Sequence, residues 1–269
     1  MRLLAIITKI AVQKKLKDRY NIYIDKGNGE EYGFSVSEDT LIQLGLKKGM
    51  EVDEFELSEL GYRESIQKAY SKAIHYLSVR MRSEQEIRQH LLEKEVESPV
   101  IQEVIHKLAG QGYLNDLEFA LAYVRTQINT TKKGPIVIKN ELQEKGIKGE
   151  MLEQALDQYS PDLQLQHAID LLEKLNKKPN KQSMVQYRMK VEQQLTVKGY
   201  QRIIIQKALE ESFPKENEDL EWQNLVSQGE KLKKKYSKYE GYDYMQKMKA
   251  ALYRKGFSID IIQKYLNED

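Results

Sequence analysis

A pattern of apolar residues recurs four times between residues 87 and 266 of this chain. Each copy is anchored on a lysine, with apolar residues at offsets −7, −3, +2, +7, +10 and +11 from it. The anchors are Lys94, Lys145, Lys198 and Lys255, so the copies lie 51, 53 and 57 residues apart. The offsets before the anchor fall on one face of a helix, and so do the last three. Each copy therefore predicts two amphipathic helices, and the recurrence predicts a repeat protein.

A turn separates the two predicted helices of each copy. Gly146, Gly199 and Gly256 directly follow their anchor lysines. Glycine adopts the left-handed conformation that commonly ends a helix. Glu95 takes this place in the first copy, so its turn must be built differently or be slightly strained.

A further helix is predicted upstream of each pair, at about residues 63–79, 118–128, 161–175 and 219–236. The unit is then three helices, and it occurs four times. A unit of about 50 residues buries little surface alone, so neighbouring units are expected to pack in series. The predicted fold is mainly α, an elongated and curved tandem array of four three-helix repeats.

The first 60 residues have a different pattern. Apolar and polar residues alternate at 19–25 and 32–37, with Gly27 and Gly29 between them, which is typical of a β-hairpin. Residues 7–13 are a third expected strand, and Ser37 is expected to cap a short helix that runs through Leu44. The predicted domains are a β-rich N-terminal unit at 1–60 and repeats at 61–116, 117–160, 161–214 and 215–269.

Capping residues support these boundaries. Ser83 and Glu86 have the spacing of a capping box. Asn115 or Asp116 is expected to cap the next helix. Ser160 precedes a proline, which is favoured at the first position of a helix.

The composition excludes several classes of protein. The 269 residues include no Cys, which fits a reducing compartment, and 31% of them are charged. The N-terminal run "MRLLAIITKIAVQKK" is a poor signal peptide, and no apolar stretch approaches the ~18 residues needed to span a bilayer. We expect a soluble, cytoplasmic protein without membrane contact.

No catalytic pattern is visible. The chain has no phosphate-binding GxxxxGK[ST] motif, and the glycines near residue 29 fit a hairpin turn better than a dinucleotide site. The four His residues have no metal-ligand spacing and are expected at the surface or the boundary of helices. We expect no enzyme activity, no cofactor and no metal.

Basic residues recur between the first and second helix of every repeat. We call these four segments the basic breaks: "VRMRS" in repeat 1, "TTKKGP" in repeat 2, "NKKPNK" in repeat 3 and "KKKYSKYEG" in repeat 4. Arg88, Lys139 and Lys249 also share an offset of six before the anchor, although Glu192 interrupts that series.

Two interpretations of the basic breaks remain open. A single exposed lysine is best explained by solvation, whereas recurrence in four repeats favours an edge that binds a polyanionic partner. The net charge is only +2, so attraction to a polyanion would have to come from local clusters of basic residues. The candidate partner-binding residues are Arg80, Arg82, Arg88, Lys132, Lys133, Lys139, Lys177, Lys178, Lys181, Lys234, Lys235 and Lys238.

Tyrosines cluster beside the last basic break, at positions 236, 239, 242 and 244. Such side chains could stack on nucleic-acid bases. Packing of a helix end on its neighbour is the interpretation that we favour.

Three stretches resemble one known family. They are "AIHYLSVRMRSEQEIRQHLLEK" (73–94), "VIHKLAGQGYLNDLEFALAYV" (104–124) and "KKGPIVIKNELQEKGI" (132–147). Together they resemble the RecX regulatory proteins of bacteria, through the patterns Tyr-Leu…Arg-x-Arg-Ser-x-x-Glu, Gly-Tyr-Leu-Asn-Asp…Phe-Ala and basic-Gly-Pro…Glu-Leu…Lys-Gly-Ile. Repeats 3 and 4 are more divergent. The β-rich unit and the fourth repeat resemble the longer form found in low-GC Gram-positive bacteria.

The resemblance implies a function that the repeats alone would not. RecX proteins are non-enzymatic modulators of RecA, the ATP-dependent recombinase that polymerises on single-stranded DNA. They lie along the groove of the RecA filament, block its extension or favour its disassembly, and lower ATPase and strand exchange. The implied partner is the RecA nucleoprotein filament, with single- or double-stranded DNA as a further partner, and a monomer is expected. The alternative is an autonomous DNA-binding protein of helix-turn-helix or homeodomain type, although the third helices offer few base-reading side chains.

Overall fold

A four-stranded antiparallel sheet opens the computed structural model, which describes residues 4–14, 17–176, 181–213 and 218–268. The strands lie in the order β3-β2-β1-β4, and Ile7 of β1 pairs with Ile24 of β2. Their bounds are β1 Leu4–Val12, β2 Arg19–Asp25, β3 Glu30–Ser37 and β4 Glu51–Asp53. The three predicted strands are confirmed with small shifts at their ends, and β4 was not predicted because three residues are too few to show an alternating pattern.

One face of the sheet is buried because successive side chains of a strand point to opposite faces. Its core contains Ile7, Ile22, Ile24 and Val36, which are joined by Leu60 of the following helix. Helix α1 (Glu38–Gln43) follows β3, and the Ser37 side chain caps it by accepting from the Thr40 N–H, as predicted.

The long helix α2 (Glu54–Leu77) starts nine residues before the predicted start at residue 63. Asp53 and Glu56 form a capping box at its start. The prediction missed this start because it followed the repeat pattern, which begins later. The helix passes through Gly61, where no atom lies within 4 Å of the place of a Cβ. One helix thus contributes to two cores, with Leu60 in that of the sheet and Ala69 and Ala73 in that of repeat 1.

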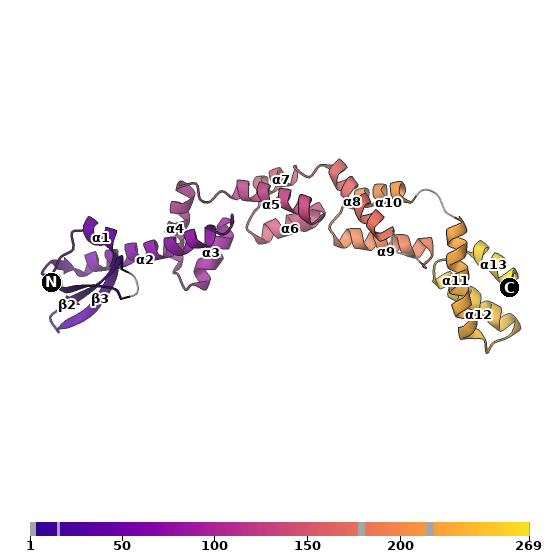
Figure 1. Cartoon of the computed structure of the whole chain (residues 1–269), viewed down its shortest axis with the longest axis horizontal. Coiled ribbons are helices and arrows are strands. Elements are labelled where there is room, and N and C mark those ends of the chain that lie inside the picture. Colours follow the sequence, from indigo (N-terminus) through magenta and orange to yellow (C-terminus); the bar gives the residue numbers. More distant parts are fainter. Residues whose placement is uncertain (1–3, 15–16, 177–180, 214–217, 269) are drawn as a thin grey trace. The chain divides into compact units, whose positions relative to one another are not determined.

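The helices from α2 onward form four groups of three (Figure 1). Repeat 1 is α2, α3 (Glu84–Glu93) and α4 (Ser98–Gly110), and repeat 2 is α5 (Asp116–Thr130), α6 (Pro135–Glu144) and α7 (Gly149–Leu156). Repeat 3 is α8 (Pro161–Asn176), α9 (Met184–Val197) and α10 (Arg202–Ser212). Repeat 4 is α11 (Glu218–Tyr236), α12 (Gly241–Arg254) and α13 (Ile259–Asn267).

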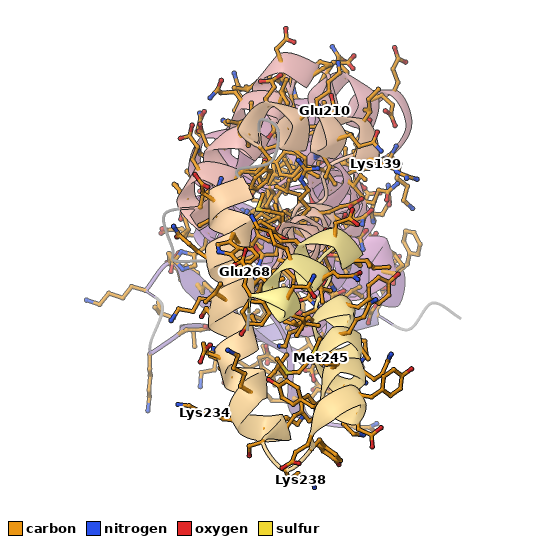
Figure 2. All side chains as sticks on the ribbon, turned by 90° about the vertical axis from the view of Figure 1, so that its right-hand side faces the viewer. Lys139, Glu210, Lys234, Lys238, Met245 and Glu268 are labelled. Carbon is orange, nitrogen blue, oxygen red and sulfur yellow. The ribbon has the colours of Figure 1, made fainter. Side chains whose placement is uncertain are left out.

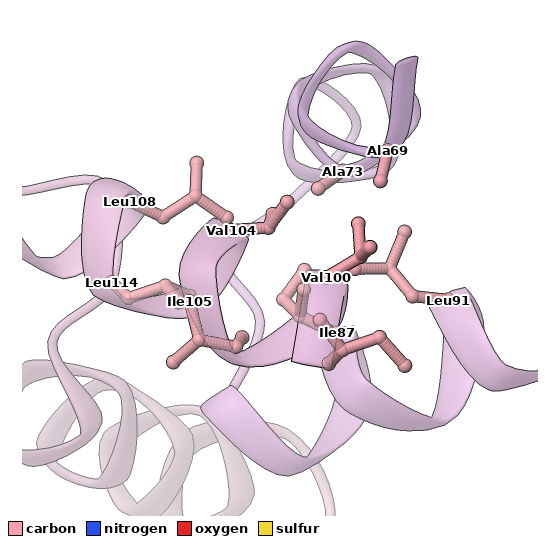
Figure 3. Close-up of a cluster of buried hydrophobic side chains, with 10 residues drawn as sticks. Ala69, Ala73, Ile87, Leu91, Val100, Val104, Ile105, Leu108 and Leu114 are labelled. Atoms are coloured by element: carbon pink, nitrogen blue, oxygen red, sulfur yellow. The ribbon is translucent and has the colours of Figure 1, made fainter. Parts of the chain in front are cut away.

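The apolar positions of the repeated pattern are the cores of these groups. All of them are buried except Val96, Leu156 and Leu209, which are partly buried. In repeat 1, Ile87 and Leu91 of α3 meet Val100 and Val104 of α4 beneath α2 (Figure 3). The predicted cores are therefore confirmed, because the 3.6-residue period determines which side of each helix faces its neighbours.

The turn after each anchor has a left-handed residue, as predicted. Its φ is 86° at Gly146, 89° at Gly199 and 85° at Gly256, and Glu95 adopts φ 58° at the equivalent place. Repeat 1 thus keeps the same kind of turn with a residue that disfavours it.

The predicted caps are confirmed, and of the two alternatives at α5 the cap is Asn115. Ser83 and Glu86 form their capping box, Asn115 accepts from the Glu118 N–H at 3.1 Å, and Ser160 accepts from the Leu163 N–H at 3.3 Å. Asp116 instead accepts from the N–H of Glu84, the first residue of α3, at 2.8 Å.

The chain divides into two compact units, Met1–Phe119 and Ala120–Asp269. The first contains the sheet, repeat 1 and the first four residues of α5, and the second contains the rest of repeat 2 with repeats 3 and 4. Within the described residues, no helix has the length and apolar character that a bilayer crossing requires.

Candidate partner-binding surface

The basic break of repeat 1 is held by contacts within the repeat. Arg80 forms an ion pair with Glu86 at 2.8 Å, and the Arg82 guanidinium lies 4.0 Å from the centre of the Tyr76 ring. The other predicted cation of this repeat, Arg88, pairs with Glu84 at 2.7 Å and donates to the Gln102 amide oxygen at 2.8 Å. These three cations are partly neutralised or stacked before any partner arrives.

The basic break of repeat 2 is also paired. Lys132 forms an ion pair with Asp170 of α8, and Lys133 pairs with Glu141 of α6. The Lys132 ammonium, together with the Gln166 amide, holds the pKa of Asp170 below its usual value. Reversing the charge of Lys132 or Lys133 would place like charges together inside the unit, so such variants would report on folding as well as on binding. Lys139 pairs with Glu153 at 2.8 Å on a more exposed face.

This break is also part of a joint between repeats 2 and 3. The N–H of Gly134 donates to the Lys198 carbonyl at 2.7 Å, and the N–H of Ile136 donates to the Gly199 carbonyl at 3.0 Å. The Tyr200 hydroxyl donates to the Lys132 carbonyl at 2.9 Å. The start of α6 therefore rests on the Lys-Gly turn of the next repeat.

A polar cluster lies beneath this joint. The Tyr159 hydroxyl oxygen lies 3.0 Å from Nδ1 of His167 and 3.3 Å from the Tyr200 hydroxyl oxygen. Burial raises the pKa of both tyrosines and lowers the pKa of His167, which the nearby Lys132 lowers further. These groups are neutral near pH 7 and hold the two repeats together through hydrogen bonds.

The joint between repeats 3 and 4 uses the equivalent places, but its donors are side chains. The Ser183 hydroxyl donates to the Lys255 carbonyl at 2.5 Å and accepts from the Gln186 N–H at 3.3 Å. The side-chain amide of Gln186 donates to the Arg254 carbonyl at 3.2 Å. The predicted Lys177 and Lys178 lie outside the described residues. Lys181 is exposed, and its carbonyl accepts from the side chain of Gln228 at 2.6 Å.

The basic break of repeat 4 differs from the others because its cations crowd together at the surface. Lys234, Lys235 and Lys238 are exposed, and Figure 2 shows Lys234 and Lys238 at the end where α11 meets α12. Residues 231–255 contain nine basic and two acidic residues, a formal charge of +7. The rest of the chain therefore carries −5, since the whole carries +2. We call residues 231–255 the basic segment.

Tyrosines lie among these lysines. The ammonium of Lys238 lies 5.3 Å from the centre of the Tyr239 ring, and that of Lys247 lies 4.4 Å from the same ring. Tyr236 and Tyr244 pack against the core of repeat 4, which confirms the favoured interpretation for these two. Tyr242 is 76% exposed, so packing of a helix end on its neighbour does not describe this residue.

A row on α12 was missed by the sequence reasoning. Tyr242, Lys249 and Tyr253 stand at i, i+7 and i+11, which puts them on one side of a helix over about 16 Å. Tyr253 is 60% exposed. The spacing was visible in the sequence, but Lys249 had been grouped by its offset from the anchor and Tyr253 had not been considered.

The structure thus separates the candidate residues into two sets. The described candidate cations of repeats 1 and 2 pair with carboxylates or, at Arg82, lie over an aromatic ring, whereas Lys234, Lys235 and Lys238 of the basic segment are exposed. No group of His, Asp or Glu side chains suited to a metal ion occurs among the residues described.

Four family models match the chain. They describe the N-terminal domain of regulatory protein RecX at residues 5–53, and the first, second and third RecX three-helix domains at 69–108, 115–156 and 218–266. The third-domain model matches the repeat that is fourth in this chain.

Curated relatives match almost the full length. The regulatory protein RecX of Bacillus cereus strain B4264 is 48% identical over 263 residues, which cover 98% of this chain and 97% of the relative. RecX of Bacillus cytotoxicus is 47% identical over the same shares of both chains.

Two solved structures share the fold. A crystal structure of regulatory protein RecX is 36% identical with a TM-score of 0.59, and covers 75% of this chain and 97% of its own. RecX from Lactobacillus salivarius is 35% identical with a TM-score of 0.53, and covers 56% of this chain and 97% of its own. With its sheet, its three-helix repeats and this identity over nearly its whole length, the chain belongs to the RecX family of regulatory proteins.

Proposed function

We propose that this protein regulates RecA by binding along the groove of the RecA filament on single-stranded DNA, and that it inhibits filament extension, ATP hydrolysis and strand exchange. It acts by binding and needs no cofactor. Membership of the RecX family supports RecA as the partner, and recombinational DNA repair in the cytoplasm as the setting.

The observation that carries the proposal is the basic segment. Its formal charge of +7 stands against a chain that is otherwise acidic, so attraction to a polyanion is focused on repeat 4. A RecA–DNA filament offers phosphates at regular intervals. Long-range attraction to phosphates is screened by salt, which makes the contact measurable.

The repeats supply the second requirement. A filament presents the same subunit surface many times, and a chain of similar modules can contact several subunits at once. Each contact then raises the effective concentration of the next, so weak contacts add to a strong one.

The direct test is RecA ATPase activity on single-stranded DNA as this protein is titrated in. We expect the rate to fall, and we expect the K234E/K238E variant to inhibit less. If both lysines contact phosphate, the slope of log affinity against log salt should become shallower by about two.

The matched control is K47E/K48E. These two lysines are exposed in the N-terminal unit and lie outside the basic segment, so the control has the same change in net charge. Equal loss of inhibition in both variants would show a general charge effect, and no inhibition by the wild type would defeat the proposal.

Autonomous DNA binding is the second candidate. The row Tyr242, Lys249 and Tyr253 favours it, because exposed aromatic rings beside a cation suit stacking on unpaired bases. Fluorescence anisotropy of labelled single-stranded DNA without RecA separates the two. Binding that is as tight without RecA as with it would favour the second candidate.

A further inference from the structure

Two joints within the second unit use the same pair of surfaces. One is the start of a second helix, at residues 134–137 in repeat 2 and 183–186 in repeat 3; we call this the docking start. The other is the Lys-Gly turn of the next repeat, at residues 198–200 and 255–257; we call this the receiving turn. In each joint the docking start donates hydrogen bonds to carbonyls of the receiving turn or of the residue just before it.

Close approach at these joints requires residues without large side chains. A Cβ on Gly134 would overlap the backbone of Gly199, and a Cβ on Gly199 would lie 2.6 Å from the Val137 backbone nitrogen. A Cβ on Gly256 would lie 2.6 Å from the Ser183 hydroxyl oxygen. Contacts this short do not occur in well-packed proteins, so glycine is needed for space at all three positions, and at Gly199 and Gly256 also for the positive φ.

The first receiving turn of the chain has no repeat before it. It is formed by Lys94, Glu95 and Val96, and Glu95 adopts φ 58°. The turn thus has the left-handed backbone of the receiving turns, with a Cβ and a carboxylate where they have hydrogen. A cavity of about 430 Å³ adjoins it, lined also by Tyr62, Lys68 and Lys72 of α2.

The last docking start in the sequence belongs to repeat 4. It begins at Glu240, the cap of α12, whose side chain makes no capping hydrogen bond and is exposed. The docking starts inside the joints have Gly134 and Ser183 at this position. The first receiving turn and the last docking start of the sequence therefore carry a glutamate where the two joints have glycine or serine.

We propose that Glu95 and Glu240 are end caps, and that the surface they close is one that fits a second copy of this chain. Without them, the docking start of repeat 4 in one copy would seat on the receiving turn of repeat 1 in the next. Such a head-to-tail contact does not close on itself and would build open fibres. Polar terminal repeats prevent this in repeat proteins generally.

Two physical effects make the caps work. The Cβ of Glu95 stands where the neighbouring backbone must lie, and the joint would bring the carboxylates of Glu95 and Glu240 together. Lys94 does not act as a cap, because Lys198 and Lys255 stand at the same place in the two joints that do form. Lys68 and Lys72 would attract Glu240, but attraction does not remove the overlap at the Cβ of Glu95.

The test is sedimentation velocity of the full chain up to about 1 mM, the order of effective concentration that a short linker provides. The wild type should sediment at a rate that does not rise with concentration. The double variant E95G/E240S should form species of growing size. The single variant E240S should sediment like the wild type, because it keeps the Cβ of Glu95 in the first receiving turn.

The control is E103S/E210S, which removes two exposed carboxylates from helix surfaces away from the ends. Circular dichroism melting should show that every variant is folded. A folded E95G/E240S that sediments like the wild type at all concentrations would overturn the proposal, as would fibres formed by the control.

Discussion

Gly199 combines two requirements that are usually met by different residues. Its φ of 89° disfavours any side chain, and the start of α6 lies against it. Gly112 has φ 76° but no atom within 4 Å of the place of a Cβ. A comparison of substitutions at the two glycines therefore separates the cost of a left-handed backbone from the cost of crowding a neighbour.

Replacing Gly199 by Ala should cost more than replacing Gly112. Both variants incur about 1–2 kcal/mol for the left-handed backbone, and Gly199→Ala adds about 1–3 kcal/mol of overpacking against Val137. Urea unfolding of both variants measures the difference. Equal losses of stability would mean that the start of α6 shifts to accept the added Cβ at no measurable cost.

Ser183 also has two roles, as the cap of α9 and as the donor to the Lys255 carbonyl. Ser183→Ala should lower the free energy of unfolding by about 1 kcal/mol for the cap and by about 1 kcal/mol more for the partly buried hydrogen bond to the Lys255 carbonyl. Ser258 is the control, because it stands at the cap of α13 without a side-chain capping bond. A loss at Ser183 no larger than at Ser258 would argue against the joint.

At the scale of elements, the polar cluster between α8 and the start of α6 should make stability depend on pH. Burial and Lys132 lower the pKa of His167 from its ordinary value of 6.5. The unfolded chain then binds a proton more readily than the folded one, so stability falls as the pH drops below about 6.5.

The variant His167→Gln isolates this effect. We expect the wild type to lose more stability than the variant between pH 7.5 and 5.5, as measured by urea unfolding at each pH. The pKa of His90 is lowered as well, and it accounts for part of the slope that the variant keeps. If the free energy of unfolding depends on pH identically in the wild type and the variant, His167 does not contribute to the pH dependence.

The elements also show which features could be predicted. The helix faces followed from the period of residues such as Ile87 and Leu142, and Ser37, Ser83 and Ser160 marked helix starts, because both signals are local in sequence. The start of α2 at Glu54 was missed because the repeat pattern begins later. The partner of Lys132 was missed because Asp170 is 38 residues away, and a distance of that kind is set by packing between repeats.

At the scale of the whole molecule, basic residues have different surroundings in different repeats. The cations of repeats 1 and 2 hold helices in place, as Arg80 and Lys133 do, and the surplus positive charge is collected in the basic segment. Sequence reasoning placed all of these cations in one set because it counts charges and cannot see their partners. The structure directs the binding experiments to repeat 4.

The joints have a consequence for how such chains change length. Gly134 and Ser183 start different helices, yet both rest on a Lys-Gly turn of the following repeat and both meet its carbonyls. A gene duplication or deletion in phase with the repeat would leave a usable contact at each new boundary. The number of modules can therefore drift among descendants without a new interface having to arise, provided that the glutamates stay at the outermost positions.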